Sequence, residues 1–112
     1  MVKLLKISQS KNPKKKFTAL FKLDNDKFKS VSFGAAGMRD FTLISNPKSK
    51  FYIDDKKSRE MVKTNYIRRH TKDLKTEANK KGIGAGALSM FVLWNKPTLA
   101  ASIKDYKKRY NL

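Results

Sequence analysis

The chain has 112 residues, with 27 lysines and arginines against 9 aspartates and glutamates, which gives a formal net charge of +18. Its length suits one domain, and its 39% hydrophobic content excludes a disordered basic tail. The absence of cysteine excludes disulfides, thiol catalysis and cysteine-ligated zinc.

Neither a signal peptide nor a membrane span is expected. Charged residues interrupt the apolar N-terminus, and no apolar stretch approaches the roughly 20 residues that a spanning helix needs. The sequence therefore predicts a soluble protein that is intracellular or packaged inside a particle.

The N-terminal segment predicts one short strand. Residues 2–7 are expected to be extended, with Leu5 and Ile7 on the same face. The polar segment 8–16, which contains a proline and three consecutive lysines, predicts a loop or a flexible basic arm.

Two alternating apolar patterns then predict a β-hairpin. Residues 17–23 and 28–33 both alternate with a period of two, and Asp24-Asn25-Asp26 between them is a typical turn sequence. Residues 41–44 are compatible with one more short strand.

The second half of the chain predicts helices. Residues 56–70 follow Asp54-Asp55, which can cap a helix, and Val62, Tyr66 and Met61 are expected to pack inward.

The remaining segments, from residue 71 onward, predict a loop and two further helices. Residues 71–84 are polar and then glycine-rich, which favours a loop or, over the polar part 71–81, a frayed helix. Residues 87–94 are apolar on every side and predict a buried helix. Thr98 is a good N-cap for a last helix that ends near Tyr110.

This order of elements predicts the fold class. Strands come first and helices last, which is typical of an α+β domain in which the two are segregated. We therefore expect a single basic domain over residues 1–112, with a small antiparallel sheet built on the N-terminal hairpin and followed by three helices.

No arrangement typical of an enzyme is evident. Gly82-x-Gly84-x-x-Ala87 matches a dinucleotide-binding pattern, but a lysine-rich polar segment precedes it where a strand is required, so we interpret it as a packed helix start. His70 is the single histidine, and Arg68 and Arg69 place like charge beside it where acid–base catalysis needs an orienting partner and a nucleophile. We expect no catalysis, no cofactor and no metal site.

The acidic residues favour the same interpretation. A two-metal nuclease needs several carboxylates at one point, and four acids of this chain could converge in that way. Capping and charge balance are the simpler interpretation of these four, which are Asp40, Asp54, Asp55 and Glu60.

Basic clusters carry the positive signal for function. Phosphate contacts by lysine and arginine release condensed counterions, and no sequence-reading motif is present. The sequence therefore predicts largely sequence-independent binding of double-stranded DNA. The expected contact residues are Lys14, Lys15, Lys16, Lys56, Arg59, Lys63, Arg68, Arg69, Lys107, Lys108 and Arg109.

Two alternatives remain open beside DNA binding: an RNA-binding protein, and an adaptor that binds an acidic host or virion protein. A role at a membrane surface is the weakest, because no segment pairs a bulky apolar face with one basic face.

The apolar C-terminal helices also suggest a homodimer. A small domain can leave such faces uncovered, and cyclic dimers are the commonest oligomers. The alternative is that residues 87–94 and the last helix bury these faces within one chain.

Four sequence blocks stand out together. They are Phe33-Gly34-Ala35-x-Gly37-x-x-Asp40-x-Thr42, Tyr66-Ile67-x-Arg69-His70, 86–99 and 102–112. These blocks resemble one family of short basic proteins from large nucleocytoplasmic DNA viruses, the giant-virus ubiquitous mini proteins. The resemblance covers residues 16–112, is weakest over 71–84, and is most specific at Leu93-Trp94-Asn95-Lys96-Pro97-Thr98-Leu99.

This resemblance implies a virus-encoded protein that binds DNA, forms a homodimer and lacks an assigned enzymatic activity. It implies a place in the virion, where the protein packages or coats viral DNA, or in the host cytoplasm or nucleus during infection.

Overall fold

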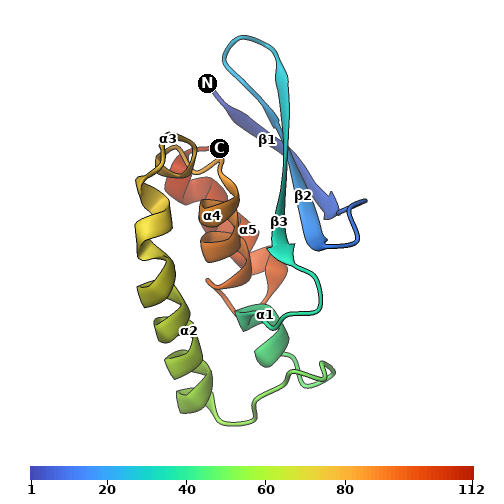
Figure 1. Cartoon of the computed structure of the whole chain (residues 1–112), viewed down its shortest axis with the longest axis vertical. Coiled ribbons are helices and arrows are strands. Elements are labelled where there is room, and N and C mark those ends of the chain that lie inside the picture. The colour runs from blue at the N-terminus through green and yellow to red at the C-terminus, as the bar shows by residue number, and fades with distance from the viewer.

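A three-stranded antiparallel sheet is packed against a set of helices in the computed structural model, which describes all 112 residues (Figure 1). Its strands run in the order β1 (Lys3–Gln9), β2 (Lys15–Lys22) and β3 (Phe28–Ala35). The α+β class is confirmed, although the helical segments are more numerous than the three expected.

Alternation along β2 and β3 creates the buried face of the sheet. Ala19, Phe21 and Phe33 are fully buried, and Phe17 pairs with Phe33 across the two strands. Side chains of period two face one side of a strand, so the predicted alternation and the predicted hairpin are confirmed.

The inward residues of β1 differ from the expectation. The register slips between Leu4 and Lys6, so that Leu4 pairs with Phe21 and Ile7 pairs with Ala19. Leu5 is the extra residue of this irregularity and is 48% exposed, whereas Ile7 packs against the core, so the prediction that these two side chains share a face is wrong.

Residues 8–16 form a tight hairpin and not a flexible arm. The Ser10 amide donates to the Lys16 carbonyl at 3.0 Å, and the Lys15 amide donates to the Asn12 carbonyl at 3.0 Å. The Asn12 side chain also accepts from the Lys14 amide. These local hydrogen bonds hold the turn together despite the repulsion between its neighbouring lysines.

Residues 41–44 form a one-turn helix, α1 (Phe41–Ile44), where a strand was expected. The Asp40 carboxylate caps it by accepting from the Leu43 amide at 3.0 Å and from the Thr42 hydroxyl at 2.5 Å. Four residues are too few for a period to show, and the capping aspartate decides the conformation.

The longest helix, α2 (Lys56–His70), begins and ends where the sequence predicted. Asp55 is its N-cap and accepts from the Ser58 amide at 3.2 Å, so the capping interpretation is confirmed. Val62 and Tyr66 pack against the core, whereas Met61 is 59% exposed and does not.

The segment predicted as a loop is helical in part. It contains the 3₁₀ helix η1 (Thr71–Lys75) and the one-turn helix α3 (Glu77–Lys80). Asn79 holds them in place, because its side chain donates to the Asp73 carbonyl at 2.7 Å and accepts from the Ala87 amide at 2.9 Å.

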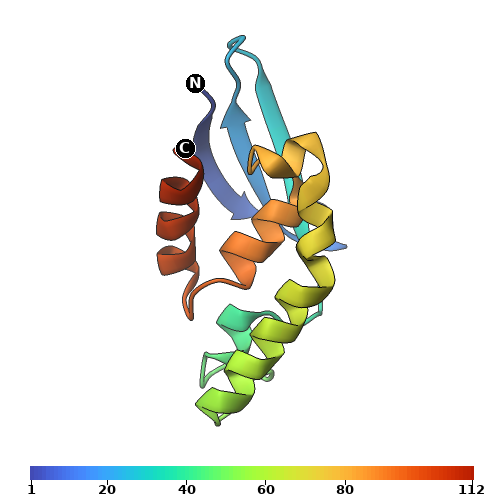
Figure 2. The same ribbon diagram turned by 90° about the vertical axis from the view of Figure 1, so that its left-hand side faces the viewer.

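The central helix is buried as predicted. It starts as α4 (Ala85–Leu88) and continues as the π-helical segment η2 (Ser89–Leu93), and most of its side chains belong to the core. The last helix, α5 (Leu99–Tyr110), is capped by Thr98 and packs against η2 (Figure 2).

These contacts remove the reason for expecting a dimer. The apolar residues 87–94 are covered within one chain by the sheet and by α5, which is the alternative that the sequence left open.

Tyr106 ties α5 to the glycine-rich segment. Its ring is fully buried, and its hydroxyl donates to the Gly82 carbonyl at 2.5 Å. Burial raises the pKa of the Tyr106 phenol, so the donor stays protonated. Gly82 has a φ of +82°, and a Cβ there would overlap the Tyr110 ring, so glycine is needed for packing.

We predict that Tyr106→Phe lowers the free energy of unfolding by about 1–3 kcal/mol, because the Gly82 carbonyl is left buried without a donor. Tyr52→Phe is the control, since it removes a hydrogen bond to Asp54 at the surface. Urea unfolding followed by circular dichroism measures both variants. Equal losses in the two would contradict the structural role of the Gly82 bond.

Candidate nucleic-acid interface

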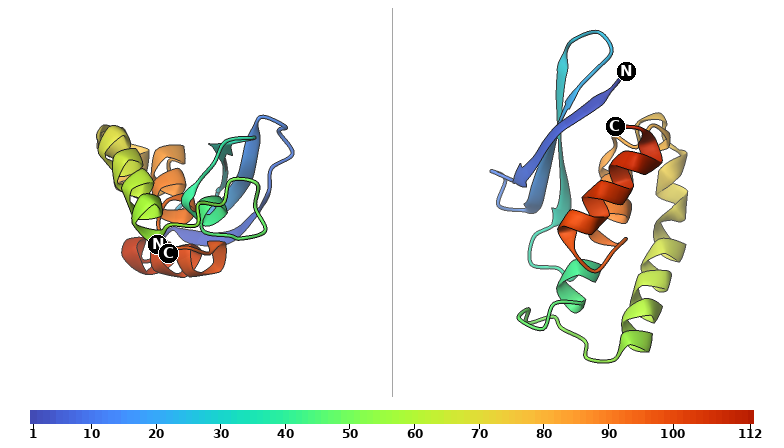
Figure 3. Two further views of the ribbon diagram at one scale, coloured as in Figure 1. Left: turned by 90° about the horizontal axis from the view of Figure 1, so that it is seen from below. Right: turned by 180° about the vertical axis from the view of Figure 1, so that it is seen from behind.

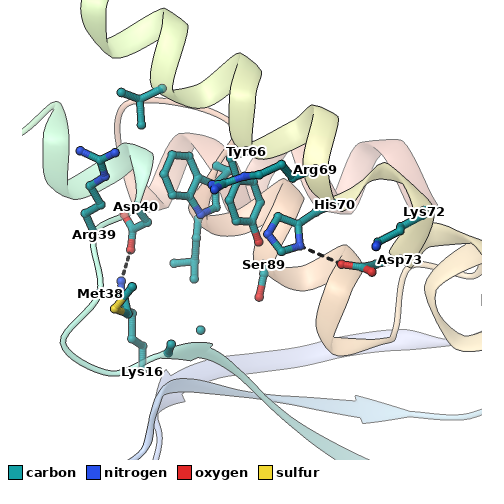
Figure 4. Close-up of a pocket in the computed structure, with 15 residues that line it drawn as sticks. Lys16, Met38, Arg39, Asp40, Tyr66, Arg69, His70, Lys72, Asp73 and Ser89 are labelled. Atoms are coloured by element: carbon teal, nitrogen blue, oxygen red, sulfur yellow. Dashed lines mark hydrogen bonds and ion pairs between the residues drawn. The ribbon is translucent and has the colours of Figure 1, made fainter.

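A cavity of about 710 Å³ opens between the C-terminal half of α2, the end of β3 and the start of η2. We call it the basic cleft (Figure 4). Its cationic residues come from three parts of the chain, namely Lys16 from β2, Arg39 from the β3–α1 loop, and Arg69 and Lys72 from the end of α2 and from η1.

A second cavity of about 340 Å³ adjoins the basic cleft, and we call it the arginine pocket. Arg39, Arg68 and Arg69 line it together with Val62 and Asn65, and three of these residues also line the basic cleft. The two hollows therefore form one continuous depression along α2.

The three arginines have no anionic partner. None of them takes part in an ion pair or a side-chain hydrogen bond, and all three are exposed. The C-terminal end of α2 is favourable for Arg68 and Arg69, but it does not account for Arg39, which comes from another segment. Like charges gathered around one hollow repel, and an anionic ligand would relieve that repulsion.

The acids near the basic cleft are already engaged. Asp40 is buried, and it accepts from the Lys16 ammonium at 2.6 Å while it caps α1. Asp73 lies 2.8 Å from Nδ1 of His70. With both carboxylates paired, the cleft keeps an excess of positive charge.

One wall of the basic cleft is a row of three aromatic rings. Trp94 and Tyr66 are stacked with centroids 4.3 Å apart and an interplanar angle of 8°, and Tyr66 is stacked on His70 at 4.2 Å. Trp94 is buried, whereas the His70 side chain is 41% exposed and ends the row. Figure 4 shows His70 beside Tyr66, with its ring turned to Asp73.

The chemistry of Tyr66 suits a neutral wall. Burial raises the pKa of its phenol, and the charge of Asp73 adds to this effect. The Tyr66 hydroxyl therefore stays protonated and presents no negative charge to an anionic ligand.

Two predicted contact residues on α2 are engaged inside the protein. Arg59 donates to the Ile53 carbonyl at 2.6 Å, and the Lys63 ammonium donates to the Asn95 carbonyl at 2.5 Å. Their shared helix face turns toward the protein. Lys56 is exposed, but it lies about 20 Å from Arg69 along the helix.

The predicted cluster on α5 is separated from the basic cleft. The α4–η2 helix lies between α5 and α2, so these two helices do not pack side by side as one contact surface would require (Figures 2 and 3). Lys107 and Lys108 are exposed, whereas Arg109 pairs with Asp105 at 3.5 Å and lies over the Phe91 ring.

The N-terminal lysines divide in the same way. Lys14 and Lys15 are exposed at the hairpin between β1 and β2, while Lys16 points to Asp40 and lines the basic cleft. Of the eleven predicted contact residues, the structure brings together Lys16, Arg68 and Arg69.

Several residues of the site escaped the sequence analysis. Arg39 and Lys72 are isolated cations in the chain, and nothing local distinguishes them from surface residues. The Tyr66 and His70 spacing of four residues was visible as a helix-face pair, and Asp73 three residues later was a candidate partner for the histidine.

Two features of the structure bear on its chemistry, and comparisons with known proteins bear on its identity. No group of three histidine, cysteine or acidic side chains is placed to hold a metal ion, and no helix is long and apolar enough to cross a membrane. No known protein family, curated protein or solved structure matches the chain.

We predict that Lys16→Met destabilises the protein by about 3–5 kcal/mol, because it leaves the Asp40 carboxylate buried without a cation. Lys22→Met is the matched control, since its pair with Asp26 is exposed and should be worth less than about 1 kcal/mol.

Thermal and urea unfolding measure both losses. The double variant Lys16→Met with Asp40→Asn should recover part of the loss, because the buried charge is then gone. A Lys16→Met variant as stable as Lys22→Met would show that the Asp40 carboxylate tolerates isolation.

Proposed function

We propose that the protein binds DNA without catalysing a reaction on it and with little preference for sequence. The observation that carries this proposal is the convergence of Arg39, Arg68 and Arg69 on one pocket without a carboxylate partner. Guanidinium groups bind phosphate oxygens in a bidentate manner, and DNA presents phosphates at regular spacing.

The composition of the depression supports phosphate contact over base recognition. Its arginines come from a loop and from the end of α2, and this helix presents no row of amide or acidic side chains that would distinguish base edges. Contacts to phosphates position a protein on DNA and carry no sequence information.

The rest of the positive charge supports the same partner. Exposed lysines on the N-terminal hairpin and on α5 lie outside the depression and would add attraction from a distance. Such attraction raises the association rate and weakens as salt is added.

We predict that Arg68→Glu with Arg69→Glu weakens binding to unrelated duplexes by a similar factor, and lowers the slope of log affinity against log salt by about two. Lys3→Glu with Lys6→Glu is the matched control. It changes the net charge equally on exposed positions of β1, away from the basic cleft.

A salt series with two duplexes of different sequence measures both pairs. Equal losses in the two variants would show that binding depends on net charge alone, and a strong preference for one duplex would contradict sequence independence. Single-stranded RNA that outcompetes duplex DNA at equal salt would favour the RNA-binding alternative.

The adaptor alternative and catalysis have their own outcomes. An adaptor gains support if DNA binding vanishes near physiological salt while a specific acidic protein co-purifies. Cleavage of supercoiled DNA with Mg²⁺ or Mn²⁺ would contradict the non-enzymatic proposal.

The viral setting is a proposal that rests on the resemblance of residues 16–112 alone. In that setting the protein would package or coat viral DNA in the virion, or act in the host cytoplasm or nucleus during infection. Detection of the chain in purified particles tests it.

Homodimerisation is a separate proposal that rests on the resemblance of residues 16–112, because the apolar helices that also suggested it are buried in one chain. A dimer would double the basic surface and lengthen the footprint on DNA. Light scattering at concentrations of tens of micromolar tests this prediction, and a monomer there would refute it without affecting the DNA proposal.

A further inference from the structure

We propose that the basic cleft holds one unpaired nucleotide of a DNA strand, with its base stacked on His70 and its phosphate on the arginine pocket. This inference rests on the proposed function and goes beyond it, because a purely backbone-binding surface needs no cavity and no aromatic wall. Surfaces that bind only the DNA backbone contact successive phosphates along an open face of the protein.

The dimensions of the basic cleft fit such a ligand. Its volume of about 710 Å³ lies within the range of about 300–1,000 Å³ that is usual for small-molecule and cofactor sites. The stacked bases of an intact duplex are not available to fill it, whereas an unpaired nucleotide at a strand end is. Its lining combines apolar side chains such as Val62 and Leu93 with cations, as a base joined to a phosphate requires.

The arginine pocket places positive charge at one end of the basic cleft. Arg39 and Arg69 line both hollows, so a phosphate bound between them remains adjacent to the aromatic wall. Arg68 lines the arginine pocket but not the basic cleft, and it offers a further donor to the same phosphate. These guanidinium groups are free to bind, since they have no partner within the protein.

His70 supplies the surface for the base. It is the exposed end of the ring row, and Tyr66 and Trp94 behind it fix its position. Proteins bind unpaired bases by stacking them on aromatic side chains, histidine among them, and this stacking tolerates any base. The inference therefore agrees with binding that is independent of sequence.

The His70 ring is held in place by the segment of residues 73–84 that packs behind it. Asp73 engages Nδ1 of His70, and Asn79 fixes the Asp73 backbone through its carbonyl. Gly84 lies so close to the Asn79 side chain that a Cβ would overlap it. This packing preorders the ring before a ligand arrives, which reduces the entropy lost on binding.

Three DNA probes separate the contributions. The first is a blunt hairpin duplex, the second carries one unpaired thymidine at its phosphorylated 5′ end, and the third carries an abasic residue in place of that thymidine. The second should bind the full-length protein roughly 5- to 150-fold more tightly than the third, which is the range expected for stacking one base on an aromatic ring.

Variants assign the difference to His70. His70→Ala should remove the advantage of the unpaired thymidine, His70→Phe should keep most of it, and Phe28→Ala should leave it unchanged. Phe28 is the matched control, because it is an aromatic residue that is 65% exposed at the start of β3. If His70→Ala unfolds, His70→Gln takes its place, because it has no ring but keeps a polar side chain beside Asp73, and it should also remove the advantage.

Arg39→Gln tests the phosphate end. It should lower the salt slope for the thymidine probe by about 0.7–0.9 and reduce the benefit of the 5′ phosphate. Trp94 is the single tryptophan and belongs to the ring row, so its fluorescence should change when the thymidine probe binds and remain unchanged with the blunt hairpin.

The outcomes distinguish this inference from the proposed function. Equal affinity for all three probes, with salt-dependent binding intact, would overturn the nucleotide site and leave general DNA binding standing. Thymidine monophosphate binding as tightly as the probe would overturn the requirement for a strand, and tighter binding of a uridine end would overturn the preference for DNA. Failure of every duplex to bind would contradict the proposed function itself.

Discussion

The chain has nine acidic side chains for 27 lysines and arginines, and this shortage of negative charge constrains every part of the structure. Several of the acids bind groups only a few residues away in the chain. Asp55 caps α2, Asp73 meets His70, and Asp105 accepts from Asn95, which together with the smaller effect of Arg109 lowers the pKa of its carboxyl. Asp40 is the one acid that is both buried and paired with a cation from a distant part of the chain. None of the nine acids lines the arginine pocket.

The cations consequently fall into two groups with different roles. Arg59 and Lys63 donate to backbone carbonyls and lie over aromatic rings, so they contribute to packing as much as to charge. Arg39, Arg68 and Arg69 have only solvent to bind. A count of basic residues in the sequence cannot separate these groups, because both kinds occur on the same helix α2.

Local chemistry was sufficient to predict the hairpin over 17–33 and the helix 56–70, since period two, turn residues and the Asp55 cap all agree there. It failed for residues 41–44, where the segment is shorter than the pattern needed to identify it. The basic cleft lay beyond sequence reasoning for another reason. Arg39 and Arg69 are 30 positions apart, and their meeting depends on how α2 is placed relative to the end of β3. No local pattern in a single sequence encodes such placement.

The π-helical segment η2 gives the chain a place where its length can change without moving the site. The Trp94 amide donates to the Ser89 carbonyl at 3.2 Å, five residues back, so this turn holds one residue more than a turn of α-helix. Loss of a single residue between Ser89 and Leu93 would return this turn to regular α-helical geometry and leave Trp94 close to its present place behind Tyr66. The same loss in the regular helix α2, between Val62 and Tyr66, would rotate Tyr66 and His70 by about 100° relative to the first half of that helix. A deletion in α2 would therefore disrupt the aromatic row, whereas a deletion in η2 would preserve it.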